Sequence, residues 1–258
     1  MTKLTSLEKA LRLVDAVAKA GNAGLRELAA ELGFPPSTVH RLLTVLTASR
    51  YLTQNPATKK YRLSLRFLEL GAMVRENLDV ITAARPHMTE LMEATSETVN
   101  LALFDGAGIA YVDQVANSNS FLRMFTRVGT RAALHCTGVG KACLAGLPKD
   151  FVTGYWQVAE KRRYTEKTIV DEPRLNRELQ VIHRQGYAVD DEEMEVGVRC
   201  VASAIRQDRN SIVAGVSISG PSSRLTTERM SLMGELVRQA AARISADLGY
   251  SGKDLESI

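Results

Sequence analysis

A break between two short amphipathic segments constrains the fold of this chain more than any other feature. The first segment, Leu25–Leu32, repeats apolar residues at helical spacing and stops at Gly33. Pro35 and Pro36 follow, and a proline fits best at the start of a helix, where its missing N–H loses no bond. A second helix is therefore predicted over residues 36–49. Two helices joined by such a tight turn form a helix-turn-helix, in which one helix lies in the major groove of DNA.

The predicted second helix has two chemically different faces. Its back is apolar and repeats at helical spacing, at Val39, Leu42, Leu43 and Leu46. Its exposed side carries groups that can contact bases or phosphates, at Ser37, Thr38, His40, Arg41 and Thr44. Arg41 is the candidate for a bidentate contact with guanine. In the alternative interpretation, Ser37 and Thr38 only cap the helix and Arg41 is solvated.

Elements on either side extend this unit to a winged helix-turn-helix. A helix is predicted over residues 6–20, because Thr5 and Glu8 have the spacing of a capping box. Short strands at 51–54 and 61–63 enclose a turn at 55–60, which predicts a β-hairpin wing. Its basic side chains are expected to meet the phosphate backbone or the minor groove, at Lys59, Lys60 and Arg62. A helix over 64–78 has no evident partner in this unit and is interpreted as a linker.

The positive charge of the chain is concentrated in the same region. The 258 residues have a net charge of +4, and residues 1–80 hold 12 Lys and Arg against 7 Asp and Glu, while the remainder is nearly neutral. A basic N-terminal third is what binding to a polyanion requires. No apolar run reaches the roughly 18–20 residues of a membrane span, and the N-terminus has no signal-peptide core. We therefore expect a soluble, cytoplasmic protein.

A different pattern begins near Asp79 and predicts a separate α+β unit. Helices are expected at 80–95, 137–144, 151–156, 173–184 and 226–248, and strands at 99–104, 109–114, 121–125, 187–190, 201–205 and 212–218. The expected organisation is a winged helix-turn-helix over 1–63, a linker helix over 64–79 and a larger domain over 80–258. In that domain, helices are expected to pack on an antiparallel sheet.

Three motifs in order give the chain a resemblance to the IclR-type bacterial transcriptional regulators, named for the isocitrate lyase regulator. The motifs are LGFPPSTVHRLL at 32–43, LHCTGVGKACL at 134–144 and GYAVDDEEMEVGVRC at 186–200. The last matches the spacing of the family signature at Gly186, Asp190, Glu193, Gly197 and Cys200. One departure is Ala204, where the family often carries proline. The resemblance implies a GAF-like or profilin-like effector domain that encloses a small organic acid or an aromatic compound.

The resemblance also implies an effector pocket, at Met124, Cys136, Thr137, Gly138, Asp190, Cys200, Ser217 and Ser219. The residues themselves support part of it. Residues 137–140 open a predicted helix whose N–H groups could hold a carboxylate. Ser217 and Ser219 are two apart on a predicted strand and therefore share a face. In the alternative interpretation, Met124 and the cysteines only fill the core, which is the more usual role of Cys136 and Cys143.

Two other classes of protein compete with a regulator. A thiol enzyme on a GAF-like fold is the main rival, since Cys136, Cys143 and Cys200 are too few for a disulfide framework and read as free thiols. Such an enzyme would not need residues 1–62. The third interpretation is a module that holds a partner protein. No metal-ligand spacing, phosphate loop or dinucleotide fingerprint occurs, so neither a metal nor a cofactor is expected.

We therefore expect a ligand-responsive transcriptional regulator that represses its target genes and has no catalytic site. Its partners are double-stranded operator DNA and a small carboxylate or aromatic acid. A two-fold homodimer is expected, because one recognition helix buries too little surface to discriminate an operator. The apolar faces of the 6–20 and 64–78 helices are the expected seams, and the resemblance implies a dimer of dimers.

Overall fold

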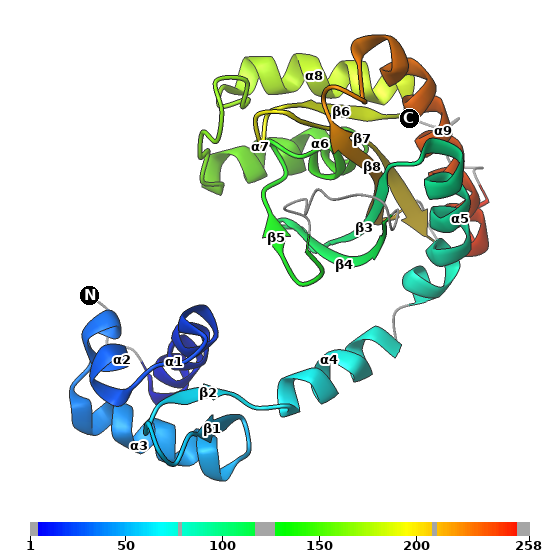
Figure 1. Ribbon diagram of the computed structural model, residues 1–258. Helices are drawn as coiled ribbons and strands as arrows, with labels where there is room; N and C mark the ends of the chain where they lie inside the picture. The colour runs from blue at the N-terminus through cyan, green and yellow to red at the C-terminus, as the bar shows by residue number, and fades with distance from the viewer. Residues whose placement is uncertain (1–4, 77–78, 117–126, 208–210, 252–258) are drawn as a thin grey trace. The chain divides into compact units, whose positions relative to one another are not determined.

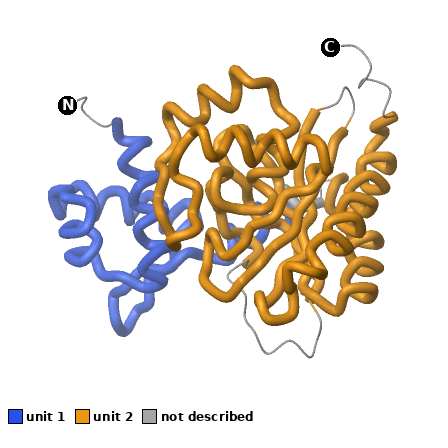
Figure 2. The backbone as a smooth tube through the Cα atoms, turned by 90° about the horizontal axis from the view of Figure 1, so that it is seen from above, with its two compact units in different colours: residues 1–77 blue, residues 78–258 orange. Residues whose placement is uncertain are grey.

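The computed structural model describes residues 5–76, 79–116, 127–207 and 211–251. The chain divides into two compact units, residues 1–77 and 78–258, which Figure 2 shows in separate colours. Each unit has a hydrophobic core of its own. Among the described residues, no helix is both long and apolar enough to cross a lipid bilayer.

The first unit is the predicted winged helix-turn-helix. Its elements are α1 (Ser6–Ala20), α2 (Leu25–Leu32), α3 (Pro36–Ala48), β1 (Leu52–Gln54), β2 (Tyr61–Leu63) and α4 (Arg66–Glu76) (Figure 1). The predicted capping box begins α1, and Gly33 ends α2 in the left-handed conformation, with φ of 65°. Leu13, Leu28 and Leu43, one from each of the first three helices, are fully buried in the core of this unit.

The helix interpreted as a linker is anchored in the first unit at its start. The rings of Tyr51 and Phe67 pack edge to face with their centroids 5.6 Å apart, and the Ser64 hydroxyl donates to the Arg50 carbonyl oxygen. The expectation that this helix has no partner in the unit is therefore wrong for its first turn. The cause is an aromatic pair between residues sixteen positions apart, which helical periodicity does not reveal.

Among the described residues, the second unit forms a six-stranded antiparallel sheet with helices on both faces. The strand order is β5-β4-β3-β8-β7-β6, with β3 (Thr98–Phe104), β4 (Ile109–Val115), β5 (Arg131–Ala132), β6 (Ala188–Asp191), β7 (Val198–Gln207) and β8 (Ser211–Pro221). One face packs against α5 (Asp79–Thr95) and α9 (Thr227–Asp247). The other packs against α6 (Gly138–Ala145), with α7 (Lys149–Val158) and α8 (Glu172–Gln185) on the same side (Figure 1). The predicted α+β class is confirmed.

The sheet differs from the prediction in its extent. β7 and β8 are longer than the predicted strands, because their backbone ladder continues beyond the apolar centre as far as the pairs Val198 with Pro221 and Gln207 with Ser211. Apolar alternation marks only the central part of such strands. The two-residue β5 was not predicted and is defined by its pairing with the start of β4. The strand predicted at 121–125 lies outside the described residues.

Candidate functional site

The DNA-facing candidates of α3 lie mainly on its solvent side. Ser37, His40, Arg41 and Thr44 are exposed, and Thr38 is half-buried. A proline occupies the N-cap position of α3, and no side chain caps this end of the helix. The hydroxyls of Ser37 and Thr38 are thus not used as caps, which weakens the alternative interpretation. The Thr44 hydroxyl donates to the His40 carbonyl oxygen at 2.9 Å.

The wing carries its basic residues in different environments. Lys59 is exposed in the β1–β2 turn, where its backbone has φ of 57° and the Asn55 side-chain oxygen accepts two backbone N–H groups. The Lys60 ammonium instead pairs with Glu27 of α2 at 3.2 Å. Arg62 is exposed on β2. Lys59 and Arg62 are therefore better placed than Lys60 for contacts with a phosphate backbone.

In the second unit, the register of the sheet brings distant residues, most of them polar, into two adjacent rows. The first row runs across β6, β7, β8 and β3, at Asp190, Cys200, Ser219 and Thr98. The second row runs across β7, β8, β3 and β4, at Ala202, Ser217, Asn100 and Gln114. Both rows lie on the α6 face, because the residues that alternate with them belong to the core against α5 and α9.

Hydrogen bonds connect the two rows. The Gln114 side-chain nitrogen donates to Asn100 Oδ1 at 2.8 Å, and Asn100 Nδ2 donates to Ser219 Oγ at 3.1 Å. The hydroxyls of Ser217 and Ser219 face the Cys200 thiol. Asn100 is almost completely buried. A buried chain of this kind fixes the orientation of the Ser219 hydroxyl.

A cavity of about 310 Å³ lies over the first row. It is lined by Tyr111, Thr137, Gly138, Tyr164, Asp190, Met194, Glu195, Val198, Cys200 and Ser219. Its size is at the lower end of that of small-ligand pockets. Of the other implied residues, Cys136 and Ser217 are buried in the same unit and Met124 lies outside the described residues. A larger hollow of about 520 Å³ between α6, α7 and α8 contains none of the implied residues.

Half of the lining residues were not predicted from the sequence: Tyr111, Tyr164, Met194, Glu195 and Val198. Met194, Glu195 and Val198 fall within the 186–200 motif, which could have indicated them. Tyr111 faces the cavity because a β-bulge shifts the register of β4 against β3, which turns Tyr111 to the face opposite Val115. Tyr164 lies between α7 and α8, where no local pattern marks it.

The N-terminal end of α6 borders the cavity. Thr137 is its N-cap residue, whose hydroxyl accepts the Gly140 N–H at 3.1 Å and donates to the Ala133 carbonyl oxygen at 2.9 Å. A helix N-terminus provides a positive potential that favours a bound anion. A Cβ on Gly138 would lie only 3.1 Å from the Cys200 sulfur, so the glycine lets this end of α6 approach β7 closely.

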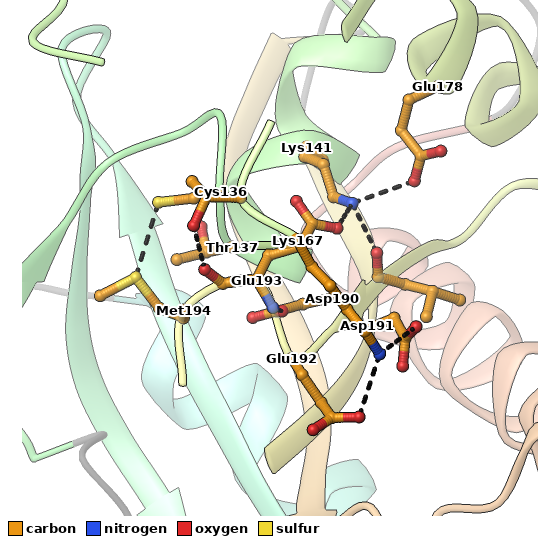
Figure 3. Close-up of polar contacts among 12 residues, drawn as sticks. Cys136, Thr137, Lys141, Lys167, Glu178, Asp190, Asp191, Glu192, Glu193 and Met194 are labelled. Atoms are coloured by element: carbon orange, nitrogen blue, oxygen red, sulfur yellow. Dashed lines mark hydrogen bonds and ion pairs between the residues drawn. The ribbon is translucent and has the colours of Figure 1, made fainter. Parts of the chain in front are cut away.

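A buried lysine joins α6 to the loop that follows β6 (Figure 3). The Lys141 ammonium donates to the Glu178 carboxylate at 3.0 Å, to the Val189 carbonyl oxygen at 2.6 Å and to the Glu193 carboxylate. Burial by itself lowers the pKa of Lys141, but Glu193 and Glu178 outweigh it, so that the pKa is raised. Lys141 is therefore charged, and its ion pairs hold the loop to α6.

The loop 192–197 forms part of the cavity wall and is held at several further points. Glu192 has φ of 63°, a left-handed conformation that surrounding contacts must stabilise. The Thr165 hydroxyl donates to the Glu192 carbonyl oxygen at 2.7 Å, and the Thr168 hydroxyl donates to that of Glu193 at 2.6 Å. Asp190 Oδ1 accepts the Glu193 N–H at 2.7 Å. These bonds place Met194 and Glu195 against the cavity.

The cysteines are part of the interior. Burial raises the pKa of Cys136 and of Cys143 to about 12, and that of Cys200 to about 11. Such thiols are protonated near neutral pH and are poor nucleophiles. The ring of His135 contacts the Tyr155 hydroxyl at 3.2 Å. In the part of the chain that the structure describes, no cluster of three His, Cys, Asp or Glu residues could hold a metal ion. The geometry therefore favours ligand binding over thiol catalysis.

A winged helix-turn-helix followed by a unit with a small-molecule cavity defines a class, that of DNA-binding regulators that carry a ligand-binding domain. The comparisons with known families agree. Residues 6–56 match the IclR helix-turn-helix domain, and residues 72–246 match the C-terminal domain of the bacterial transcriptional regulator IclR. The chain belongs to the IclR family of bacterial transcriptional regulators. It is a regulator with a DNA-binding domain and not an enzyme.

Several known proteins are similar over nearly the whole chain. The HTH-type transcriptional repressor AllR of Salmonella typhimurium is 38% identical over 245 residues, which cover 95% of this chain and 90% of AllR. AllR of Escherichia coli K12 is 37% identical over 245 residues, which again cover 95% of this chain and 90% of AllR. The crystal structure of Thermotoga maritima IclR is 32% identical, with a TM-score of 0.76 over 95% of this chain and 99% of that one.

A further solved structure shares the fold and contains a ligand. It is an IclR homolog from Microbacterium hydrocarbonoxydans complexed with 4-hydroxybenzoate. The TM-score is 0.81, at 22% identity, over 95% of this chain and 99% of that one. At this identity the likeness concerns the fold alone.

Proposed function

We propose that this protein is a repressor whose binding to operator DNA is controlled by a small organic acid held in the cavity. The observation that carries the proposal is the cavity itself, in which Asp190, Cys200 and Ser219 meet the N-terminal end of α6. The name of the AllR relatives supports repression as the sign of regulation. The 4-hydroxybenzoate in the Microbacterium homolog supports an organic acid as the class of effector.

In this proposal the protein acts in the cytoplasm, and each part of the chain has its own role. Residues 1–63 read the operator, with Ser37, His40 and Arg41 at base edges or phosphates. Residues 64–79 connect the DNA-binding domain to the effector domain, and residues 80–258 bind the effector. The functional species is a homodimer, or a dimer of dimers, because two recognition helices are needed to discriminate an operator.

The effector acts by differential affinity. A ligand shifts an equilibrium between two arrangements only if it binds one of them more tightly. Couplings between ligand and DNA sites typically amount to about 5–150-fold in affinity. A productive effector should therefore change the apparent operator affinity by a factor in this range.

The test is an operator-binding titration with and without candidate acids. Fluorescence anisotropy would measure binding to a duplex from the region upstream of the protein's own gene, at low salt. The acids would be monocarboxylates of two to seven carbons, with and without a further oxygen at C2, each compared with its uncharged amide. We expect specific binding, and a change of about tenfold with at least one acid and not with its amide. A protein that binds no duplex under any of these conditions would contradict the proposal.

Two basic residues provide a sharper test of the DNA-binding surface. Arg41→Ala should remove sequence preference by costing about 1–3 kcal/mol at one base pair, because a bidentate guanine contact is lost. Lys59→Ala should weaken binding to all duplexes alike and reduce the slope of log affinity against log salt by about one. Anisotropy titrations on operator and scrambled duplexes separate the two effects. If Arg41→Ala left the sequence preference intact, its proposed role would be wrong.

A further inference from the structure

The cavity contains carboxyl groups but no basic side chain. Asp190 and Glu195 are acids among its ten lining residues, none of which is Lys, Arg or His. The cation that acts on Asp190 is Lys141. An ammonium group has three N–H donors, and those of Lys141 are engaged by Glu178, Glu193 and the carbonyl oxygen of Val189. Lys141 therefore has no donor left for an effector carboxylate (Figure 3).

The surroundings of Asp190 are already negative without an effector. The ionisable groups nearest to it are Lys141 of α6, Glu193 and Glu195 of the loop, Cys136 before α6, Cys200 of β7, Tyr111 of β4 and Tyr164 between α7 and α8. Two groups of α8 act on this cluster from outside, Glu178 on Lys141 and Glu193, and Arg174 on Glu193. Three carboxylates, those of Glu178, Glu193 and Glu195, thus stand against two cations, Lys141 and Arg174. An ionised Asp190 would add a further buried negative charge, and an effector carboxylate would add another beside it. Close carboxylates in a buried site relieve such repulsion by sharing a proton.

From this geometry we infer that Asp190 enters the effector complex as a neutral carboxylic acid and donates its O–H to the effector carboxylate, so that one proton is bound together with the effector. The inference rests on the proposed function and restricts the effector to ligands that offer an anionic oxygen to Asp190. The proton comes from solvent and stays on Asp190, and no covalent bond of the effector changes. Asp190 Oδ1 accepts the Glu193 N–H, and the Met194 N–H also acts on this carboxyl group, so the backbone of the loop orients Asp190 in the cavity wall.

The ionisation of the free protein agrees with this geometry. Burial, reinforced by Glu193, raises the pKa of Asp190 to about 7. A bound anion raises the pKa of Asp190 further, because it destabilises the ionised form. Below pH 7 the acid form is already present, and the affinity for the effector is then independent of pH. Above pH 7 the affinity falls by up to about tenfold per pH unit, until the pKa of the complex is passed.

The first test follows the ionisation of Asp190 directly, first without a ligand and then with one. The full chain would be labelled at the side-chain carboxyl carbon of aspartate and titrated by NMR from pH 5.5 to 8.5. The signal that disappears in Asp190→Asn identifies Asp190. We expect this signal to titrate with a midpoint near pH 7. A signal that stays ionised over the whole range with saturating acetate bound overturns the inference.

The second test counts protons on binding. Acetate and 4-hydroxybenzoate would be titrated calorimetrically at pH 7.5 in two buffers of different ionisation enthalpy. The wild-type protein should take up roughly 0.5–0.7 proton per ligand, because about a quarter of Asp190 is already protonated at pH 7.5, and its affinity should be about tenfold lower at pH 8.5 than at pH 6.5. Asp190→Asn retains a neutral donor, so its affinity should not depend on pH and it should take up no proton.

Asp191→Asn is the matched control. Asp191 follows Asp190 on β6, so that its side chain lies on the opposite face, where it pairs with Lys167 at 3.0 Å. This variant should take up protons like the wild type. Proton uptake that survives in Asp190→Asn, or is lost in Asp191→Asn, overturns the inference. If neither acid binds while Asp190 titrates near pH 7, the effector class of the proposed function fails, and the inference fails with it.

Discussion

At the scale of single residues, Lys141 has the largest structural consequence in the second unit. A lysine is rarely buried unless every donor is satisfied, and each of its three donors has an oxygen acceptor. Its ion pairs join α6, α8 and the loop after β6, and two of these elements, α6 and the loop, border the cavity. In the sequence this residue stands out only as part of a Gly-Lys pair without the rest of a phosphate loop. Its role follows from burial.

The buried ion pairs of Lys141 predict a large loss of stability when they are broken. Lys141→Met should lower the free energy of unfolding by about 3–5 kcal/mol, because it leaves the buried Glu193 carboxylate without a counter-ion. Urea denaturation followed by circular dichroism measures the change. Lys167→Met is the matched control, since Lys167 also contacts two carboxylates, those of Asp191 and Glu192, but is 46% exposed. Its loss should leave the stability almost unchanged. Equal losses in the two variants would contradict this account.

At the scale of elements, α6 depends on glycine for its position. A Cβ on Gly140 would collide with the backbone of Leu134, which cannot move away as a flexible side chain can. Gly154 of α7 is also helical, but nothing surrounds the place where its Cβ would be. The two glycines thus have opposite roles, since one permits a close approach and the other only lowers the helix propensity of α7.

This difference predicts opposite effects of the same substitution. Gly140→Ala should lower the free energy of unfolding by about 1–3 kcal/mol, because it overpacks the start of α6. Gly154→Ala should raise it by roughly 0.5–1 kcal/mol, because alanine favours the helix. Thermal unfolding of the two variants beside the wild type measures both signs. A Gly140→Ala protein as stable as Gly154→Ala would show that α6 can shift without cost.

Local sequence signals predicted the helices and strands far better than they predicted which residues line the cavity. The ends of α1 and α2 follow from a capping box and from Gly33, which are chemical signals within a few residues of the ends they set. The two rows of the sheet also follow from alternation once the strand order is known. Tyr111 could not be placed, because a single inserted residue in β4 reverses the face on which it lies. Tyr164 could not be placed either, since a long-range approach of the α7–α8 connection brings it to the cavity.

At the scale of the whole molecule, exposed apolar side chains are over-represented in the first unit. It holds half of the large exposed apolar side chains found among the described residues, although it is less than a third of the chain. Leu7 and Leu11 lie one turn apart on α1, and Leu68 and Met73 lie on α4. These are the helices for which the sequence predicts dimer seams, and an exposed apolar face of this kind favours association.

The proposed dimer predicts a linked loss of assembly and of DNA binding. The double substitution Leu7→Lys and Leu11→Lys should raise the dimer dissociation constant by at least about tenfold, because each leucine loses apolar burial worth over about 1 kcal/mol. Sedimentation velocity measures the assembly, and anisotropy measures operator binding, which should weaken in parallel. Val158→Lys, at an exposed valine at the end of α7, is the control and should change neither. A double variant that stays dimeric would place the seam elsewhere.

The row formed by Asp190, Cys200 and Ser219 has a consequence for how this regulator can diversify. These side chains project from a ladder whose hydrogen bonds are made by the backbone alone. Exchanging one of them alters the chemistry offered to a metabolite and leaves the strand pairing as it was. In the proposed pocket, single codon changes in this row can thus alter which small molecules bind, without rebuilding the sheet beneath it.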